Sequence, residues 1–122
     1  MASRKRQPTE SSHRNGVPQA LLDEIVRRVV DVAKPDRIIM FGSSARGTMG
    51  PDSDVDLLVI KANVPHRRRL AQEIYLSRFG IPVPVDVVVV TPDDIRAYGD
   101  KVGTIIGPAL REGRQLYAAQ AA

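Results

Sequence analysis

The chain has 122 residues and is 43% hydrophobic, which is sufficient for one compact domain with its own core. It contains no cysteine, so disulfide scaffolds, thiolate zinc sites and cysteine nucleophiles are excluded. No apolar stretch approaches the roughly 20 residues of a membrane span, and the first residues lack the apolar core of a signal peptide. We therefore expect a cytoplasmic protein with no membrane partner.

The net charge of +4 is concentrated in two basic clusters, one from Arg4 to Arg6 and one from His66 to Arg69. Nucleotide phosphates, an acidic protein surface and nucleic acid would all complement such clusters. Aromatic residues make up only 4% of the chain, so few side chains are available to stack on bases. Nucleic acid is therefore not the expected partner. The plainest role of each basic cluster is a solvated surface, and contact with nucleic acid is the alternative.

Residues 1–16 are polar and show no periodicity, which predicts a disordered basic tail ahead of a single domain at residues 17–122. From Val17 onward, apolar residues recur at helical spacing as far as Pro35, which predicts an amphipathic helix. The short apolar run from Arg37 to Phe41 stands directly before a glycine and is typical of a strand.

A glycine then turns the chain, and residues 43–46 can open a short helix. Residues 55–60 form the second predicted strand, and residues 65–79 form the second long helix. Tyr75 and Phe79 stand four residues apart on this helix, and we expect both in the core.

Residues 83–90 form the third predicted strand, which is β-branched almost throughout and is expected to be buried on both faces. Thr91 has the chemistry of a helix N-cap, because a proline and two acids follow it. A last helix around residues 105–110 ends at Gly113, and residues 115–118 are expected to add an edge strand. The predicted fold class is a small α/β (α+β) domain whose sheet carries acidic residues.

Asp54 and Asp56 stand at the start of the second strand, so their carboxylates project from the same face with Cα atoms roughly 7 Å apart. Without a cation, one carboxyl of such a pair would be pushed toward its protonated form. Mg²⁺ prefers a few carboxylates together with phosphate oxygens and waters, which matches this pair beside a phosphate-binding turn. Asp86 interrupts the third strand, where a lone buried carboxylate would be costly without a metal or another partner. If the two strands are neighbours, the three acids form a catalytic site for two metal ions.

The turn at Gly42 supplies the phosphate-binding half of this site. Gly42 lets the backbone approach a phosphate with no Cβ in the way. The N–H groups of Ser43 and Ser44, at the start of a short helix, favour anions. The Ser43 hydroxyl adds a donor, and Arg46 adds a positive charge. These residues predict a nucleotide-binding site that holds the phosphates of a nucleoside triphosphate.

Two other motifs are excluded by their spacing. An EF-hand loop over these acids would need glycine and glutamate where Leu57 and Asn63 stand. A Walker A loop would need lysine and serine or threonine where Thr48 and Met49 stand. A structural role, with surface acids at a strand end and a salt-bridged Asp86, remains the alternative.

The segment from residue 35 to residue 60 resembles the signature of the nucleotidyltransferase superfamily that includes DNA polymerase beta. The signature is Gly-Ser, ten further residues and Asp-x-Asp, which here reads Gly42-Ser43 and then Asp54-Val55-Asp56. The segment is most similar to the minimal nucleotidyltransferases, the antitoxins of toxin–antitoxin systems whose toxins contain a HEPN domain. The resemblance implies a polymerase beta-like core, a small mixed sheet flanked by helices, and it places the third carboxylate at Asp86.

The resemblance also implies a chemistry for these residues. Asp54 and Asp56 would hold two Mg²⁺ ions, and Asp86 would complete the metal site or act as general base. An acceptor hydroxyl would attack the α-phosphate of ATP, release pyrophosphate and retain AMP. The implied acceptor is a tyrosine of a HEPN toxin, with which the chain would form a hetero-oligomer as its antitoxin.

Three other functions remain open from the sequence. The chain could act on a small molecule such as an aminoglycoside, with the help of a separate subunit. It could also neutralise a toxin by binding alone, or act as an RNA-binding module through its basic clusters.

Overall fold

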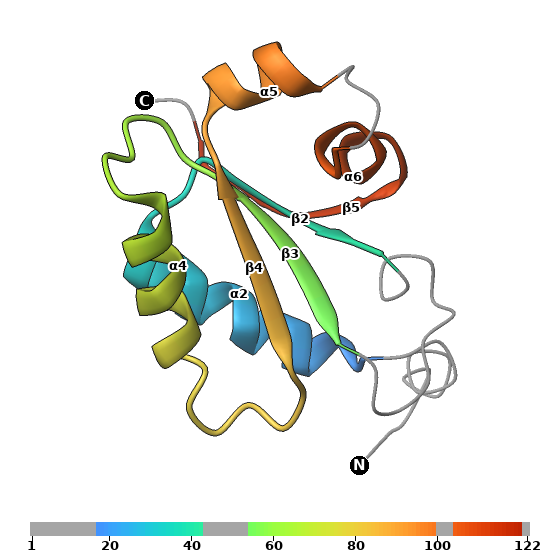
Figure 1. Cartoon of the computed structure of the whole chain (residues 1–122). Helices are drawn as coiled ribbons and strands as arrows, with labels where there is room; N and C mark the ends of the chain where they lie inside the picture. The colour runs from blue at the N-terminus through green and yellow to red at the C-terminus, as the bar shows by residue number, and fades with distance from the viewer. Residues whose placement is uncertain (1–16, 43–53, 100–103, 121–122) are drawn as a thin grey trace.

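Within the described residues, which are 17–42, 54–99 and 104–120, four strands form one mixed sheet in the order β4-β3-β2-β5 (Figure 1). In this computed structural model the strands are β2 (Arg37–Phe41), β3 (Val55–Ile60), β4 (Val85–Val90) and β5 (Arg114–Ala118). β3 pairs antiparallel with β2 and parallel with β4, and β5 pairs antiparallel with the other side of β2. The predicted strands and the predicted edge strand near the C-terminus are therefore confirmed.

Two predictions lie outside the described residues. These are the tail at residues 1–16 and the short helix at residues 43–46. Both stay predictions, and so does the division of the chain into a tail and one domain.

The helix α2 (Gln19–Ala33) ends at Lys34, whose φ of 48° is left-handed, and the buried Pro35 follows it. A left-handed residue followed by a proline cannot continue a helix, so the chain enters β2 here. None of the described helices is both long enough and apolar enough to cross a membrane.

The helix α4 (Arg67–Leu76) connects the parallel strands β3 and β4, as parallel pairing requires. It is shorter at both ends than the predicted 65–79. The Ser77 hydroxyl donates to the carbonyl of Ile74 at 2.6 Å, and residues 77–80 form a turn in which Gly80 has a φ of +85°. Phe79 therefore lies beyond the helix, and its side chain is not in the core that the helical spacing predicted.

Two shorter helices follow β4. The helix α5 (Pro92–Tyr98) begins with a complete capping box, in which the Thr91 side chain accepts from the Asp94 N–H and the Asp94 carboxylate accepts from the Thr91 N–H. This confirms the N-cap predicted at Thr91. The helix α6 (Ile106–Glu112) leads into β5 through Gly113.

The two faces of the sheet are covered differently (Figure 1). α2 and α4 cover one face, and α5 and α6 lie over the other. The larger core cluster joins α2 and α4 to the first face, and its fully buried strand residues include Ile38, Val55, Leu57 and Val59. The smaller cluster joins the second face to α6 and contains Ile39, Leu58, Ile60, Val90, Ile106 and Ala109.

The third strand is not buried on both faces as predicted. β4 is an edge strand of the described sheet, and Asp86 and Val88 on the second face are exposed. The β-branched composition alone could not reveal this, because exposure depends on the strand order and on how far the short helices α5 and α6 reach over the face.

Candidate active site

The acidic residues lie at the start of the two parallel strands. In the register of β3 and β4, Asp56 is the direct partner of Asp86, and Val55 is the partner of Val85. Side chains alternate along a strand, so Asp56 and Asp86 share the second face, opposite the core residues Val55 and Val85. Asp54 immediately precedes β3. The strand order therefore brings two of the predicted carboxylates side by side.

Gly42 lies at the end of β2, next to the same carboxylates. Phe41 is the register partner of Asp56, and Gly42 has a φ of +75°, a conformation that favours glycine. A Cβ built on Gly42 would stand only 2.7 Å from Asp56 Oδ2. The backbone angle favours glycine here, and any Cβ at this position would have to displace the Asp56 carboxylate. The glycine turn and the acids, which the sequence separates, form one site.

The electrostatics of this site centre on Asp56. Partial burial raises the pKa of the Asp56 carboxyl above its ordinary value of 3.8, and the negative charges of Asp86 and Asp54 raise it further. Both effects disfavour the charged form of the carboxyl. The site therefore concentrates negative charge that a bound cation would compensate.

Asp86 differs from the prediction in its surroundings. The side chain is exposed, so the cost of burying a carboxylate does not apply to it. Its predicted position beside Asp56 is nevertheless the one observed. Among the described residues Asp86 takes part in none of the ion pairs, which involve Glu24, Asp31, Asp93 and Asp94. The salt-bridged, structural role for Asp86 therefore finds no support in the described part of the chain.

The acids were predicted to hold metal ions. No group of three His, Cys, Asp or Glu side chains among the described residues is arranged to hold an ion. The donors at the site are nevertheless all carboxylate oxygens, which is the ligand type that Mg²⁺ prefers, and the charges of Asp86 and Asp54 raise the pKa of Asp56. The residues that would hold ions are Asp54, Asp56 and Asp86, and this assignment stays a prediction.

The remaining predicted residues of the site are Ser43, Ser44 and Arg46. All three lie outside the described residues. Their roles as phosphate-binding groups therefore stay predictions, anchored by the position of Gly42 immediately before them.

A pocket of about 200 Å³ adjoins the glycine turn. Phe41 and Gly42 form one wall, and Ile105, Pro108 and Glu112 from the α6 region form another. The sequence alone gives no sign that the α6 residues adjoin the glycine turn. No motif marks them, because they join it only when β5 returns the chain to the edge of β2.

The family follows from a comparison with known proteins. Residues 22–107 match the model of the nucleotidyltransferase domain family, and this span includes Gly42, Asp54, Asp56 and Asp86. The chain belongs to this family. The fold and the juxtaposed glycine and acids agree with that membership.

One relative is a protein of Methanocaldococcus jannaschii that is assigned as a protein adenylyltransferase. It is 39% identical over 84 residues, which cover 62% of this chain and 56% of the relative. The match thus spans little more than half the length of that protein.

Two solved structures are similar in fold. A protein of Sulfolobus solfataricus assigned as a nucleotidyltransferase has a TM-score of 0.58 and 20% identity, with 89% of this chain and 85% of that chain covered. A toxin–antitoxin structure with AMP-PNP has a TM-score of 0.54 and 23% identity, with 85% of this chain and 76% of that chain covered. At these identities the likeness concerns the fold, and it confirms the predicted nucleotidyltransferase core.

Proposed function

We propose that this chain transfers AMP from ATP to a hydroxyl group, a tyrosine of a partner HEPN toxin, and that it thereby acts as an antitoxin. The observation that carries the proposal is the contact between the glycine turn and the acids. Gly42 approaches Asp56 so closely that a Cβ there would have to displace the Asp56 carboxylate, and Asp86 is the register partner of Asp56. A phosphate-binding turn beside paired carboxylates is the arrangement that nucleotidyl transfer needs.

The comparisons support the finer parts of the proposal. The Methanocaldococcus jannaschii relative is assigned as a protein adenylyltransferase, which supports a protein acceptor. The toxin–antitoxin structure with AMP-PNP supports both an adenine nucleotide and a toxin as the partner in a hetero-oligomer. The HEPN class of the toxin and the tyrosine acceptor rest on the family resemblance of the Gly-Ser and Asp-x-Asp signature.

The reaction can be written with the residues of this site. The oxygen of the acceptor hydroxyl forms a bond to the α-phosphorus of ATP, and the bond from that phosphorus to the oxygen bridging to the β-phosphorus breaks. Pyrophosphate leaves with the electron pair, AMP stays on the acceptor, and the hydroxyl proton passes to Asp86 as general base. The backbone N–H groups after Gly42 hold the phosphates in place.

Asp54 and Asp56, with Asp86 completing the set, would hold two Mg²⁺ ions. When bound, such ions stabilise the negative charge on the phosphates and lower the pKa of the attacking hydroxyl. The protein's own part is to keep the carboxylates side by side through the pairing of β3 with β4.

The pocket of about 200 Å³ beside Gly42 is the proposed position of the nucleoside. Its walls include the apolar side chains of Phe41, Ile105 and Pro108, which suit the faces of an adenine ring. The pocket adjoins the glycine turn, so a nucleoside there would keep its phosphates beside Asp56.

The test is mass spectrometry of a candidate HEPN toxin incubated with this chain, ATP and Mg²⁺. We expect the toxin to gain one or more AMP units. Asp56→Asn should reduce the rate about a thousandfold, which corresponds to about 4 kcal/mol. The matched control is Asp31→Asn, which removes an exposed acid on α2 and should leave the rate unchanged.

Other outcomes would contradict the proposal. A stable complex without AMP transfer, in which the toxin is still neutralised, would establish neutralisation by binding alone. AMP transfer to an aminoglycoside but not to the toxin would establish a small-molecule acceptor.

A further inference from the structure

The end of α4 and the turn after it expose three large apolar side chains. Tyr75 is 46% exposed, Leu76 is 70% exposed and Phe79 is 87% exposed. Single apolar residues on a surface are common, but adjacent ones that gain nothing from the core often mark an interaction site. Tyr75, Leu76 and Phe79 are together called the apolar rim.

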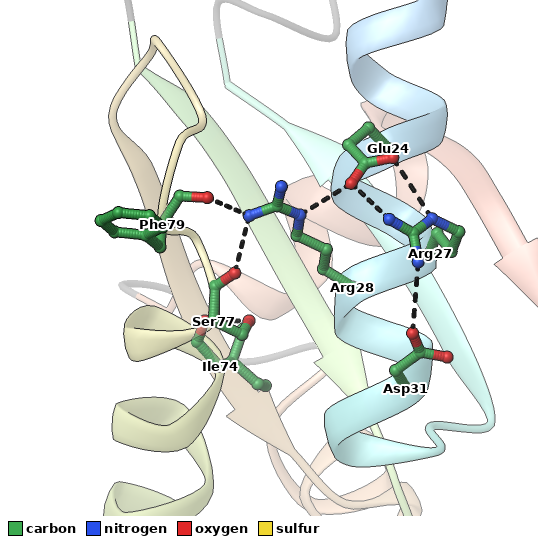
Figure 2. A network of polar contacts seen from close by, with 7 residues as sticks. All are labelled: Glu24, Arg27, Arg28, Asp31, Ile74, Ser77 and Phe79. Carbon is green, nitrogen blue, oxygen red and sulfur yellow. Dashed lines mark hydrogen bonds and ion pairs between the residues drawn. The ribbon is translucent and has the colours of Figure 1, made fainter.

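The turn that carries Phe79 is fixed by hydrogen bonds rather than left loose. The Arg28 guanidinium, on α2, donates to the carbonyl of Ser77 at 3.0 Å and also to the carbonyl of Phe79 (Figure 2). Glu24 accepts from Arg28 Nε at 2.8 Å and so holds the guanidinium in place. Figure 2 shows the Phe79 ring pointing away from α2 while its carbonyl faces Arg28. The backbone is therefore anchored, and the ring is presented outward.

A pocket of about 400 Å³ opens beside this rim, between the end of α4 and the start of β4. Its lining includes Tyr75, Arg78 and Asp86, together with the proline-rich segment 81–84. The volume lies within the usual range for ligand pockets. Of the rim residues Tyr75 lines the pocket, and so does Asp86, the proposed general base.

Arg78 brings a positive charge to the lining of the pocket, which also contains Asp86. Its guanidinium lies 3.8 Å from the centre of the Tyr75 ring. In the described part of the chain Arg78 forms no ion pair, and its buried Nε has no hydrogen-bond partner. A guanidinium pairs most strongly with a carboxylate.

The order of the strands indicates from which side an acceptor must come. Gly42 on β2, Asp56 on β3 and Asp86 on β4 lie across three neighbouring strands. In an in-line displacement the attacking oxygen and the leaving oxygen stand on opposite sides of the phosphorus. With the phosphates held at Gly42, pyrophosphate leaves on the β2 side, so the acceptor approaches from the β4 side, where the 400 Å³ pocket lies.

We propose that this pocket and its apolar rim form the docking site for the acceptor, a segment of a partner protein in which a tyrosine stands beside acidic residues; the proposal rests on the proposed function. The tyrosine side chain enters the pocket and brings its hydroxyl to Asp86. An acidic neighbour pairs with Arg78, and apolar residues of the partner cover Leu76 and Phe79. Arg78 is thus a positioning residue that selects acidic acceptor segments.

The occupant is a protein segment because the rim extends well beyond the pocket. A small molecule that filled the pocket would leave Phe79 in water. A nucleic acid would be attracted by the charge of Arg78, but it offers little apolar surface to cover Leu76.

The experiment uses the full chain and three peptides, with binding followed by fluorescence anisotropy. The first peptide carries one tyrosine flanked by glutamates, the second replaces the glutamates by glutamines, and the third replaces the tyrosine by phenylalanine. We expect the first peptide to bind at least about tenfold more tightly than the glutamine peptide, or about 1.4 kcal/mol. With ATP and Mg²⁺, only the tyrosine peptides should gain AMP.

Variants with matched controls locate the binding. Phe79→Ala should weaken the first peptide about tenfold, whereas Tyr98→Ala, which removes a side chain 49% exposed on α5, should leave its binding within about twofold. Arg78→Gln should abolish the preference for glutamates, Arg78→Lys should restore it in part, and Arg68→Gln at the other end of α4 should retain it. In transfer assays Arg78→Gln should raise KM for the peptide and leave KM for ATP unchanged.

The outcomes separate the docking site from the proposed function. Equal binding of the glutamate and glutamine peptides, equal losses in Phe79→Ala and Tyr98→Ala, or tighter binding of a single-stranded RNA would each overturn the docking site. Tight, Arg78-dependent peptide binding with no AMP transfer to peptide or toxin would support the docking site and contradict the proposed function.

Discussion

The two faces of the sheet, although built from the same strands, serve different purposes. On β3, the side chains of Val55, Leu57 and Val59 point toward α2 and α4 and are fully buried. Asp56, between two of them, points to the second face, where α5 and α6 cover only the part beyond it. The first face carries the larger part of the core, and the open end of the second face carries the proposed active site.

This comparison explains how a small domain can tolerate a cluster of acids. The alternation of side chains places each acid directly beside core residues in sequence but on the opposite side of the sheet. Leu57 stabilises the strand that carries Asp56, but its side chain lies on the opposite face and does not line the acidic site. Neighbouring charges can thus disfavour the charged form of Asp56 while the strand that carries it stays packed through Val55 and Leu57.

The largest expected effect is on the first face. Leu57→Ala should lower the free energy of unfolding by about 4 kcal/mol, because it opens a cavity in the larger cluster. Leu58→Ala, in the smaller cluster, should cost about 3 kcal/mol. Urea denaturation measures both. A greater loss in Leu58→Ala would mean that the second face, not the first, provides most of the stability.

The second prediction concerns Gly42. Gly42→Ala should cost about 1–2 kcal/mol, because a φ of +75° is strained for alanine, and it should also abolish AMP-PNP binding by pushing on Asp56. Gly80→Ala is the matched control, since its φ of +85° is similar but a Cβ there meets only Arg28 Nη2, at 3.9 Å. It should lose similar stability and retain AMP-PNP binding, measured by calorimetry. Loss of binding in both variants would assign the effect to backbone strain alone.

The third prediction concerns the opposite end of the parallel strands. Thr91→Ala removes the N-cap of α5 and should cost about 1 kcal/mol in thermal or urea unfolding. Because Thr91 follows β4 at the end remote from the acids, AMP-PNP affinity should not change. A parallel loss of affinity would show that the two ends of the strands are coupled.

The smallest effect is a pH dependence. The pKa of Asp56 is raised in the folded chain, so its charged form destabilises the fold at neutral pH. In the presence of EDTA, Asp56→Asn should therefore melt at a higher temperature than the unchanged chain at pH 7. As the pH falls through the folded pKa toward the ordinary value of 3.8, the carboxyl is protonated in the folded state first and the difference should shrink. If Asp56→Asn instead melted at a lower temperature than the unchanged chain at pH 7, Asp56 would be stabilised as a carboxylate by folding.

The sequence predicted most of the fold for a physical reason. The strands at residues 37–41 and 55–60 have the predicted bounds, because short apolar runs between turn residues leave few alternatives. The predicted end of α4 at residue 79 was wrong. The Ser77 hydroxyl and Gly80 end the helix locally, while the apolar spacing continues to Phe79. The exposure of Phe79 follows from that local break, whereas Tyr75 lies within α4 and is nevertheless 46% exposed, so its predicted place in the core was wrong as well.

The site was predicted only in part. The spacing of Gly42, Asp54 and Asp56 predicted the nucleotidyltransferase family, which the family model confirms, and the pairing of β3 with β4 places Asp86 beside Asp56. The exposure of Asp86 was missed, because it depends on β4 being an edge strand. The 400 Å³ pocket was missed as well, since it is formed by a helix end and a strand start that meet only in three dimensions.

The most direct test of the central claim is an NMR titration of the ¹⁵N-labelled chain with AMP-PNP and Mg²⁺. The claim is that the open end of the second face binds the nucleotide. It predicts that the amide signals of Gly42, Asp56 and Asp86 shift together and saturate, while Thr91 and Val29 do not move. Shifts centred on Thr91, or no shifts at saturating nucleotide, would contradict the assignment of the site.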